Sequence, residues 1–373
     1  MTQTNRETFA VPDELRAWLA RAAESGASDL HLVAGYPPVL RLHGDLVPLS
    51  DLPLSGEEIQ RLLAPLCPAD ASARLQSKKN IDLSFDLAAG GRSQRFRANL
   101  FHAGGHLAAC LRVVPATIPD CAWTGFPPEL ARRLAAVRDG LVIVTGPTGS
   151  GKTTTLAMIV NQLNQAGGCR ILTVEEPVEY LFPPAGSSVV TQREVGVDVL
   201  TFADGLRSGL RQDPDVILVG EVRDRETAQM ALSAAETGHL VFTTLHTRDA
   251  KGAVTRYADL FPLDVQRDVR AQLALSLRAV VAQRLLPDVE RGAKRHLALE
   301  VLWNTYPIAS AIRAGKVESI DNYLLTGRDD GMISFDESIR RLLHAGKISR
   351  EVAEHNVRDV SFLKRSGDLL TAL

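Results

Sequence analysis

Nine residues near the middle of the chain have the composition of a phosphate-binding loop. The stretch GPTGSGKTT, residues 146–154, fits the pattern G-x-x-x-x-G-K-[ST]. Glycines let backbone N–H groups curl around an anion, the lysine reaches the β- and γ-phosphates, and the first threonine hydroxyl binds Mg²⁺. We therefore predict that ATP is bound by Gly146, Pro147, Thr148, Gly149, Ser150, Gly151, Lys152, Thr153 and Thr154, with Thr153 also a ligand of Mg²⁺.

The residues on either side of this loop support the same interpretation. The apolar run LVIVT, residues 141–145, precedes the loop as a buried strand would. After it, Leu156, Ile159, Val160 and Leu163 recur at helical spacing. A chance glycine loop would lack this order of strand, loop and helix, and the helix adds its positive N-terminal end to the phosphate site.

Acidic residues follow two further apolar runs. Glu221 ends DVILVGE, and Glu175 and Glu176 end RILTVEE. Ligands bind at the carboxyl ends of the strands in such sheets, and carboxylates there can hold Mg²⁺ and orient a water molecule. We predict that Glu221, Glu175 and Glu176 are catalytic and that Glu176 and Glu221 also bind the metal. Taken singly, acidic residues at strand ends are usually solvated, and which glutamate takes a proton stays open.

His239 and His246 stand at the two ends of the run HLVFTTLH. A strand of this length separates them by about 20 Å, so the two cannot share one metal ion. One of them is a candidate sensor of the γ-phosphate, and the alternative for each is a structural, hydrogen-bonded histidine. Earlier in the chain, Arg95 and Arg97 are two apart on a predicted strand, so both project from one face, which by itself is consistent with ordinary solvation.

The patterns around these residues predict two kinds of sheet. Residues 12–26 form an amphipathic helix with Leu15, Leu19 and Ala22 on one face, and period-two alternation up to residue 114 predicts an antiparallel sheet in an α+β domain. Residues 115–128 are a proline-rich connector. From Leu141, apolar runs alternate with helical patterns, which is typical of a mainly parallel sheet.

The C-terminal part is predicted to be helical. From about Pro262 we expect mostly helix, with Val269, Leu273, Leu277 and Val280 on one apolar stripe. The predicted organisation is α/β overall, with domains at residues 1–114, 129–290 and 291–373 around the connector at 115–128.

Composition argues against several classes of function but leaves a local basic patch open. The 373 residues carry a net charge of −2, so no global field favours stable binding of nucleic acid. No apolar run reaches the roughly 18 residues of a membrane span, and no leader pattern precedes the first helix. The four cysteines are far apart in the sequence and include no CxxC pair, so we expect reduced thiols in an intracellular protein.

Four segments in order resemble one family. GPTGSGKT, ILTVEEPVEY, LRQDPDVILVGEVRD and AAETGHLVFTTLHT are similar to the Walker A, Asp-box, Walker B and His-box series of the type II/type IV secretion ATPases. The early ASDLHL and GYPPVLRLHGDL resemble the N-terminal domain of the pilus-retraction branch. QREVGVD and VVAQRL are similar to PilT/PilU-like retraction ATPases. The likeness covers about residues 12–360.

The resemblance implies an N-terminal PAS-like domain, a RecA-like P-loop ATPase domain and a homo-hexameric ring with ATP between subunits. It implies that Glu221 is the Walker B glutamate, that Glu175 and Glu176 are the Asp-box pair, and that His239 and His246 are the His-box histidines. It also implies that arginines reach the nucleotide from the N-terminal domain, namely Arg95, Arg97 and Arg112.

The same resemblance implies a cytoplasmic pilus-retraction motor at the inner membrane, working on a membrane platform protein. Two departures bear on that role. Glu176 stands where the Asp box usually has aspartate, and ASAIRAGKVES keeps only Ala311, Ile312 and Arg313 of a C-terminal motif of the branch. An accessory motor beside a paralogous retraction ATPase therefore stays open, as do a secretion or DNA-handling motor and a regulatory subunit with little turnover.

Overall fold

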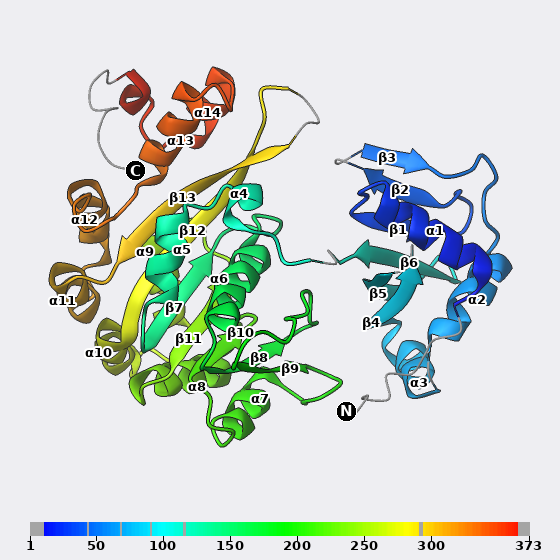
Figure 1. The fold of residues 1–373 in the computed structure, drawn as a ribbon, viewed down its shortest axis with the longest axis horizontal. Helices are drawn as coiled ribbons and strands as arrows, with labels where there is room; N and C mark the ends of the chain where they lie inside the picture. The colour runs from blue at the N-terminus through cyan, green and yellow to red at the C-terminus, as the bar shows by residue number, and fades with distance from the viewer. Residues whose placement is uncertain are drawn as a thin grey trace. The chain divides into compact units, whose positions relative to one another are not determined.

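The computed structural model describes residues 11–42, 45–67, 69–89, 92–114, 117–290 and 294–364. It divides into two compact units (Figure 1). The first contains Met1–Thr117 together with Glu179–Leu181, and the second contains Ile118–Val178 and Phe182–Leu373. The predicted domain boundary at residue 114 lies close to this division, but the short segment at 179–181 has no counterpart in the prediction.

The first unit is built on a six-stranded antiparallel sheet of order β3-β2-β1-β6-β5-β4. Its strands are β1 (Asp29–Leu32), β2 (Val39–Leu42), β3 (Asp45–Pro48), β4 (Asn80–Ala89), β5 (Arg92–Ala103) and β6 (His106–Val113). Its helices are α1 (Asp13–Glu24), α2 (Gly56–Leu63) and α3 (Ala69–Lys78), with a 3-10 turn at Ala64–Leu66.

The two faces of this sheet differ in chemistry. One face is apolar and packs in a common core with Leu15, Leu19 and Ala22 of α1, as the helical spacing predicted. The opposite face carries a polar row fixed by strand register: Ser84, Arg97, Arg112, Asp29 and Arg41 stand directly opposite one another across five strands. The antiparallel arrangement thus gathers three arginines and an aspartate that are far apart in the sequence.

The second unit is built on a seven-stranded sheet of order β13-β12-β7-β11-β10-β8-β9. All neighbouring strands are parallel except the β12–β13 pair. The strands are β7 (Gly140–Thr145), β8 (Arg170–Glu175), β9 (Val189–Glu194), β10 (Val216–Val219), β11 (Leu240–Leu245), β12 (Leu277–Pro287) and β13 (Arg295–Trp303). The predicted α/β class is confirmed.

Helices connect and cover these strands. They are α4 (Cys121–Thr124), α5 (Pro128–Ala135), α6 (Lys152–Ala166), α7 (Phe202–Gly209), α8 (Arg225–Glu236), α9 (Ala250–Asp259), α10 (Gln266–Ser276), α11 (Tyr306–Ala314), α12 (Ile320–Thr326), α13 (Phe335–His344) and α14 (Arg350–Asn356). Short 3-10 turns lie at Val317–Ser319 and Val360–Lys364. None of the helices in the described part of the chain combines the length and apolar composition that a bilayer crossing needs.

The expectation of a mostly helical chain from Pro262 is wrong for the residues of β12 and β13. Val269 and Leu273 are buried on α10, but Leu277 and Val280 belong to β12, which extends the central sheet beside β7. A strand covered on both faces is a continuous apolar run, and periodicity alone does not separate such a run from a buried helix. This strand lies next to β7, the strand that precedes the predicted phosphate loop.

Candidate functional site

The phosphate loop connects β7 to α6. Gly146 and Gly151 both have positive φ, at 151° and 86°. At Gly146 a Cβ atom would lie 2.4 Å from the backbone oxygen of Gln283, so no side chain fits there without displacing β12. The loop is therefore a tightly packed cradle, and at this position only glycine leaves room for the neighbouring strand.

Gln283 of β12 fixes the shape of the loop from outside the motif. Its Nε2 atom donates to the carbonyl oxygen of Ser150 at 2.6 Å, and its side chain is buried. The Ser150 Oγ atom is buried and has no hydrogen-bond partner among the described residues. A buried hydroxyl of this kind inside a glycine cradle is what a phosphate oxygen would satisfy. The sequence analysis did not single out Gln283, although a lone amide inside the run VVAQRLL is a recognisable signal.

Lys152 is bound to the loop and to a histidine. Its Nζ atom donates to the carbonyl oxygens of Gly146 at 2.9 Å and Pro147 at 3.2 Å, and it lies 3.4 Å from Nδ1 of His246. An ammonium group has only donors, so Nδ1 accepts in this contact. We therefore assign the proton of His246 to Nε2.

The other ring nitrogen of His246 faces Glu221. Its Nε2 atom lies 3.3 Å from Oε2 of Glu221, so this N–H donates to the carboxylate. Glu221 is held between neighbouring strands because the backbone N–H of Gly220 donates to Val174 of β8 and that of Val222 donates to Thr244 of β11. The imidazole thus connects the lysine of the loop to the glutamate at the end of β10.

A second cation, Arg223, contacts both carboxylates that are predicted to bind the metal. Arg223 places Nε 2.6 Å from Oε2 of Glu221 and another guanidinium nitrogen 3.7 Å from Oε2 of Glu176. The structure therefore brings Glu176 and Glu221 to one positive charge, which is consistent with a pair of carboxylates that can share a cation. The sequence analysis did not identify Arg223. Its position two residues after Glu221 is the signal that could have revealed it.

Glu175 has a different set of partners. Its buried carboxylate accepts from Thr173 Oγ1 at 2.6 Å and from Gln192 Nε2 at 3.2 Å. The bond from Gln192 connects β8 to β9, whereas the bond from Thr173 lies within β8. The two residues of the predicted acidic pair are therefore placed differently, with Glu176 toward Arg223 and Glu175 within the sheet.

His239 lies at the amino end of β11, at the opposite end of the strand from His246. Leu240 pairs with Gly140 at the start of β7, whereas Leu245 pairs with Thr145 at the end that leads into the phosphate loop. His239 Nδ1 lies 3.0 Å from the carbonyl oxygen of Ala234 and 3.1 Å from Thr237 Oγ1. The structure does not bring this histidine to the group formed by Lys152, His246 and Glu221, because the length of β11 separates the two ends.

The three predicted arginines lie together on the polar face of the first unit. Arg97 stands directly opposite Arg112 in the β5–β6 register and lies 3.6 Å from Glu179, a residue of the same unit. Arg112 donates to Asp29 at 2.8 Å. Arg95 is buried and donates to Ser84 Oγ at 2.9 Å. Among these three arginines, Arg97 and Arg112 are more exposed than Arg95.

Burial alone would raise the pKa of Asp29. Hydrogen bonds from Arg112 and Ser28 and the charge of Arg112 outweigh burial, so the pKa of Asp29 lies below its ordinary value. The aspartate is therefore ionised under ordinary conditions and orients Arg112 on the sheet.

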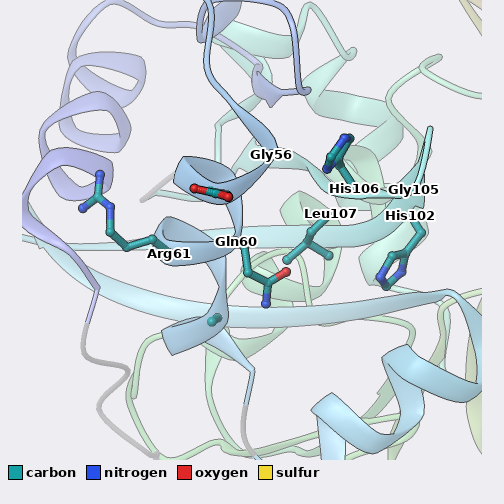
Figure 2. Close-up of a pocket in the computed structure, with 9 residues that line it drawn as sticks. Gly56, Gln60, Arg61, His102, Gly105, His106 and Leu107 are labelled. Atoms are coloured by element: carbon teal, nitrogen blue, oxygen red, sulfur yellow. The ribbon is translucent and has the colours of Figure 1, made fainter.

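A shallow hollow of about 510 Å³ lies in the first unit between α2 and the β5–β6 hairpin (Figure 2). Its lining includes His102, His106, Glu57 and Gln60, and the ring of His106 packs against Gly56. Among the described residues no group of three or more His, Cys, Asp or Glu side chains is placed to hold a metal ion. These lining side chains are exposed, and we assign no ligand to the hollow.

Comparisons with known proteins agree with the geometry of the second unit. The family model described as "Type II/IV secretion system protein" matches residues 6–358. The chain is 39% identical to the type IV pilus retractation ATPase PilT of Pseudomonas aeruginosa, over 91% of this chain and 97% of that protein. It is 41% identical to the uncharacterized protein YggR of Escherichia coli, over 88% of this chain and 98% of that protein.

A solved structure and a further relative give the same result. A crystal structure of the pilus retraction motor PilT with bound ADP is 40% identical and has a TM-score of 0.83. The match covers 94% of this chain and 99% of that chain. The type IV pilus ATPase PilU of Pseudomonas aeruginosa is 37% identical over 91% of this chain and 87% of that protein. This chain therefore belongs to the type II/IV secretion ATPase family, whose members are P-loop ATPases.

Proposed function

We propose that this chain hydrolyses Mg²⁺-bound ATP at the phosphate loop and that a homo-hexameric ring of it powers retraction of a type IV pilus, either alone or as an accessory motor beside a paralogous retraction ATPase. One observation carries the catalytic part of the proposal. His246 contacts Lys152 with one ring nitrogen and Glu221 with the other, so the phosphate-binding lysine and the proposed base are joined through a single side chain.

The residues present fit a nucleotide and a divalent cation. Gly146 leaves a cradle that a Cβ atom would close, and the buried Ser150 hydroxyl lacks a partner among the described residues. Mg²⁺ would be held by Thr153, Glu176 and Glu221. When bound, it supplies positive charge against the phosphate oxygens. The carboxylates of Glu176 and Glu221 both contact Arg223, and this shared contact with one positive charge supports their assignment as ligands of one cation.

The protein groups have separable roles in this proposal. Lys152 and the loop N–H groups bind the phosphates, and Glu221 orients a water molecule and takes up its proton. His246, with its proton on Nε2, holds the Glu221 carboxylate in place. Glu175 supports the strand end from within the sheet and stays a candidate second acceptor of the proton.

Arginines of the N-terminal unit supply the remaining positive charge. In the proposed ring, Arg97 and Arg112 approach the γ-phosphate, and Arg95 supports them from the same face. An arginine supplied in this way is worth about 10³ to 10⁵ in rate. Delivery from a separate unit would make hydrolysis depend on the position of that unit, which is a route from chemistry to movement.

The ATPase rate of the Glu221→Gln variant tests the catalytic part of the proposal. The amide keeps the shape of the side chain but cannot accept a proton as readily, so we expect kcat to fall on the order of 100-fold with ATP binding retained. Glu226→Gln, an exposed residue of α8 paired with Arg207, is the matched control and should leave kcat unchanged. An unchanged rate in Glu221→Gln would rule out this base.

Retraction is tested in cells. The proposal for pili rests on the similarity to PilT and PilU along nearly the whole chain. The proposal includes an expected partner, the platform protein of the inner membrane. Deletion of the gene should leave cells with excess, immobile pili. Bald cells would instead indicate pilus assembly. Tight, salt-sensitive retention of DNA on a filter would favour a DNA-handling motor, and a negligible ATPase rate of the purified hexamer would favour a regulatory subunit.

A further inference from the structure

Each of the four residues that follow His246 is held by a separate contact. Thr247 exchanges hydrogen bonds with Thr145 at the end of β7, at 2.9 Å and 3.0 Å. The carbonyl oxygen of Arg248 accepts from Arg284 of β12 at 3.4 Å. Asp249 and Ala250 then meet two charged side chains from the C-terminal part of the second unit. This segment is therefore constrained residue by residue rather than only by the strand before it.

Glu300 of β13 makes the contact with Ala250. Its Oε1 atom accepts from the backbone N–H of Ala250 at 2.9 Å, at the start of α9, and the side chain is 1% exposed. Burial raises the pKa of Glu300 despite the nearby cation and this backbone hydrogen bond. Burial of a carboxylate is costly, so its presence here is more consistent with a positioning role than with stability alone.

Arg358 makes the contact with Asp249. Its guanidinium lies 2.9 Å from Asp249 Oδ2, 2.8 Å from Asp321 Oδ1 and 3.5 Å from Glu300 Oε2. The backbone N–H of Arg358 donates to Asp336 at 2.8 Å, and this bond fixes the backbone from which the arginine side chain extends. Burial alone would lower the pKa of Arg358, but the carboxylates of Glu300, Asp249 and Asp321 outweigh it and raise the pKa.

Asp249 connects this centre to the helix and to the site. It caps the N-terminus of α9 by accepting from the N–H of Gly252 at 2.7 Å, and it stands three residues after His246. A planar guanidinium can satisfy carboxylates in two directions at once, whereas an ammonium group is a single point charge. Arg358 can therefore hold Asp249 in one orientation while it is itself held by Asp321.

We propose that Arg358 and Glu300 form a positioning centre that sets the conformation of residues 247–250 and thereby the place of His246 between Lys152 and Glu221. This inference rests on the proposed role of His246 in turnover. The C-terminal segment then contributes to the catalytic step without contacting the nucleotide, because it fixes the backbone that follows the histidine.

The test compares the ATPase kinetics of full-length Arg358→Ala, Arg358→Lys, His246→Ala and the double variant His246→Ala with Arg358→Ala. We expect Arg358→Ala to lower kcat by about 10- to 100-fold, the loss typical of a displaced catalytic group, while KM for ATP stays within about twofold. Arg358→Lys should restore part of the loss. Lys251→Ala is the matched control, because it removes a different cation from Asp321 and leaves Asp249 and Glu300 in place.

The double variant separates the two proposals. If Arg358 acts through His246, adding Arg358→Ala to His246→Ala should lower kcat no further. Additive losses, or a loss in Lys251→Ala equal to that in Arg358→Ala, would overturn the positioning role. An unchanged kcat in His246→Ala would instead overturn the proposed role of the histidine. Glu300→Ala, which removes the oxygen that accepts from Ala250, should lower kcat as Arg358→Ala does, and an unchanged kcat in this variant would overturn the part of the proposal that concerns Glu300.

Discussion

The Nδ1 atom of His246 lies 3.4 Å from the Nζ atom of Lys152, in a contact where the lysine donates and the imidazole accepts. Phosphate oxygens would compete with the imidazole for the same ammonium protons. Arrival of a nucleotide would therefore change what His246 contacts, while its other nitrogen faces Glu221. This pair gives the histidine a direct physical connection to phosphate occupancy that His239, at the far end of β11, does not have.

The first prediction concerns the two histidines. His246→Ala removes the donor to Glu221 and should lower kcat by about 10- to 100-fold. His239→Ala is the control, since the ring of His239 contacts Ala234 and Thr237 at the amino end of β11. Steady-state ATPase assays of both variants decide the matter. Equal effects of the two substitutions would contradict the placement of the site at the carboxyl end of β11.

The second prediction concerns Gln283. Replacing it with leucine removes the donor to the Ser150 carbonyl and leaves that buried oxygen without this bond, at a cost of about 1–3 kcal/mol. Because the bond shapes the phosphate loop, we expect the Kd for ATP to rise about tenfold, as measured by fluorescent nucleotide titration.

Gln283→Glu provides a comparison at the same position. Its carboxylate would face the Ser150 carbonyl with an acceptor instead of a donor, so it should bind ATP more weakly than the leucine variant does. Unchanged nucleotide affinity in both variants would mean that β12 does not determine the shape of the loop.

The third prediction concerns Arg97. Its substitution by alanine should lower turnover by up to about 10³-fold and leave nucleotide affinity nearly intact, because the proposed contact forms only as charge develops on the γ-phosphate. Arg61→Ala is the control in the same unit, where the arginine pairs with Glu14 on exposed helices. Parallel losses of affinity and turnover in Arg97→Ala would argue against a role in the transition state.

The fourth prediction concerns pH. The pKa of Asp29 is lowered from 3.8 in the folded protein, so the unfolded chain binds this proton more readily and stability from this group rises with pH. The stabilisation from Asp29 is complete about one to two pH units above 3.8. It is lost as the pH falls through the pKa of the folded state.

Asp29→Asn should therefore be less stable than the unmodified protein near neutral pH, and the difference should shrink below about pH 4. Urea unfolding at a series of pH values measures it. The neighbouring Arg112 keeps its charge throughout, so the change with pH reports on the carboxyl. A difference that stays constant down to pH 2.5 would exclude the Asp29–Arg112 pair as its cause.

The sequence by itself determined the local elements of this protein. The glycine spacing between an apolar run and a helical pattern identified the loop at Gly146–Gly151, since close approach of backbone and phosphate demands those residues. The helical spacing of Leu15, Leu19 and Ala22 identified the buried face of α1. The capping box that Ser55 and Glu58 form at the start of α2 likewise depends only on residues within one turn.

Contacts between distant segments were decided only by the tertiary structure. Periodicity did not show that Leu277–Pro287 is a strand, because a strand buried on both faces has the same apolar run as a buried helix. The roles of Gln283 and Arg358 depend on that strand and its neighbour β13. The division of the acidic pair into an inward Glu175 and an outward Glu176 also depends on sheet pairing. Glu175 is the last residue of β8 and contacts Gln192 of the neighbouring strand β9, whereas Glu176 follows the end of β8 and lies near Arg223.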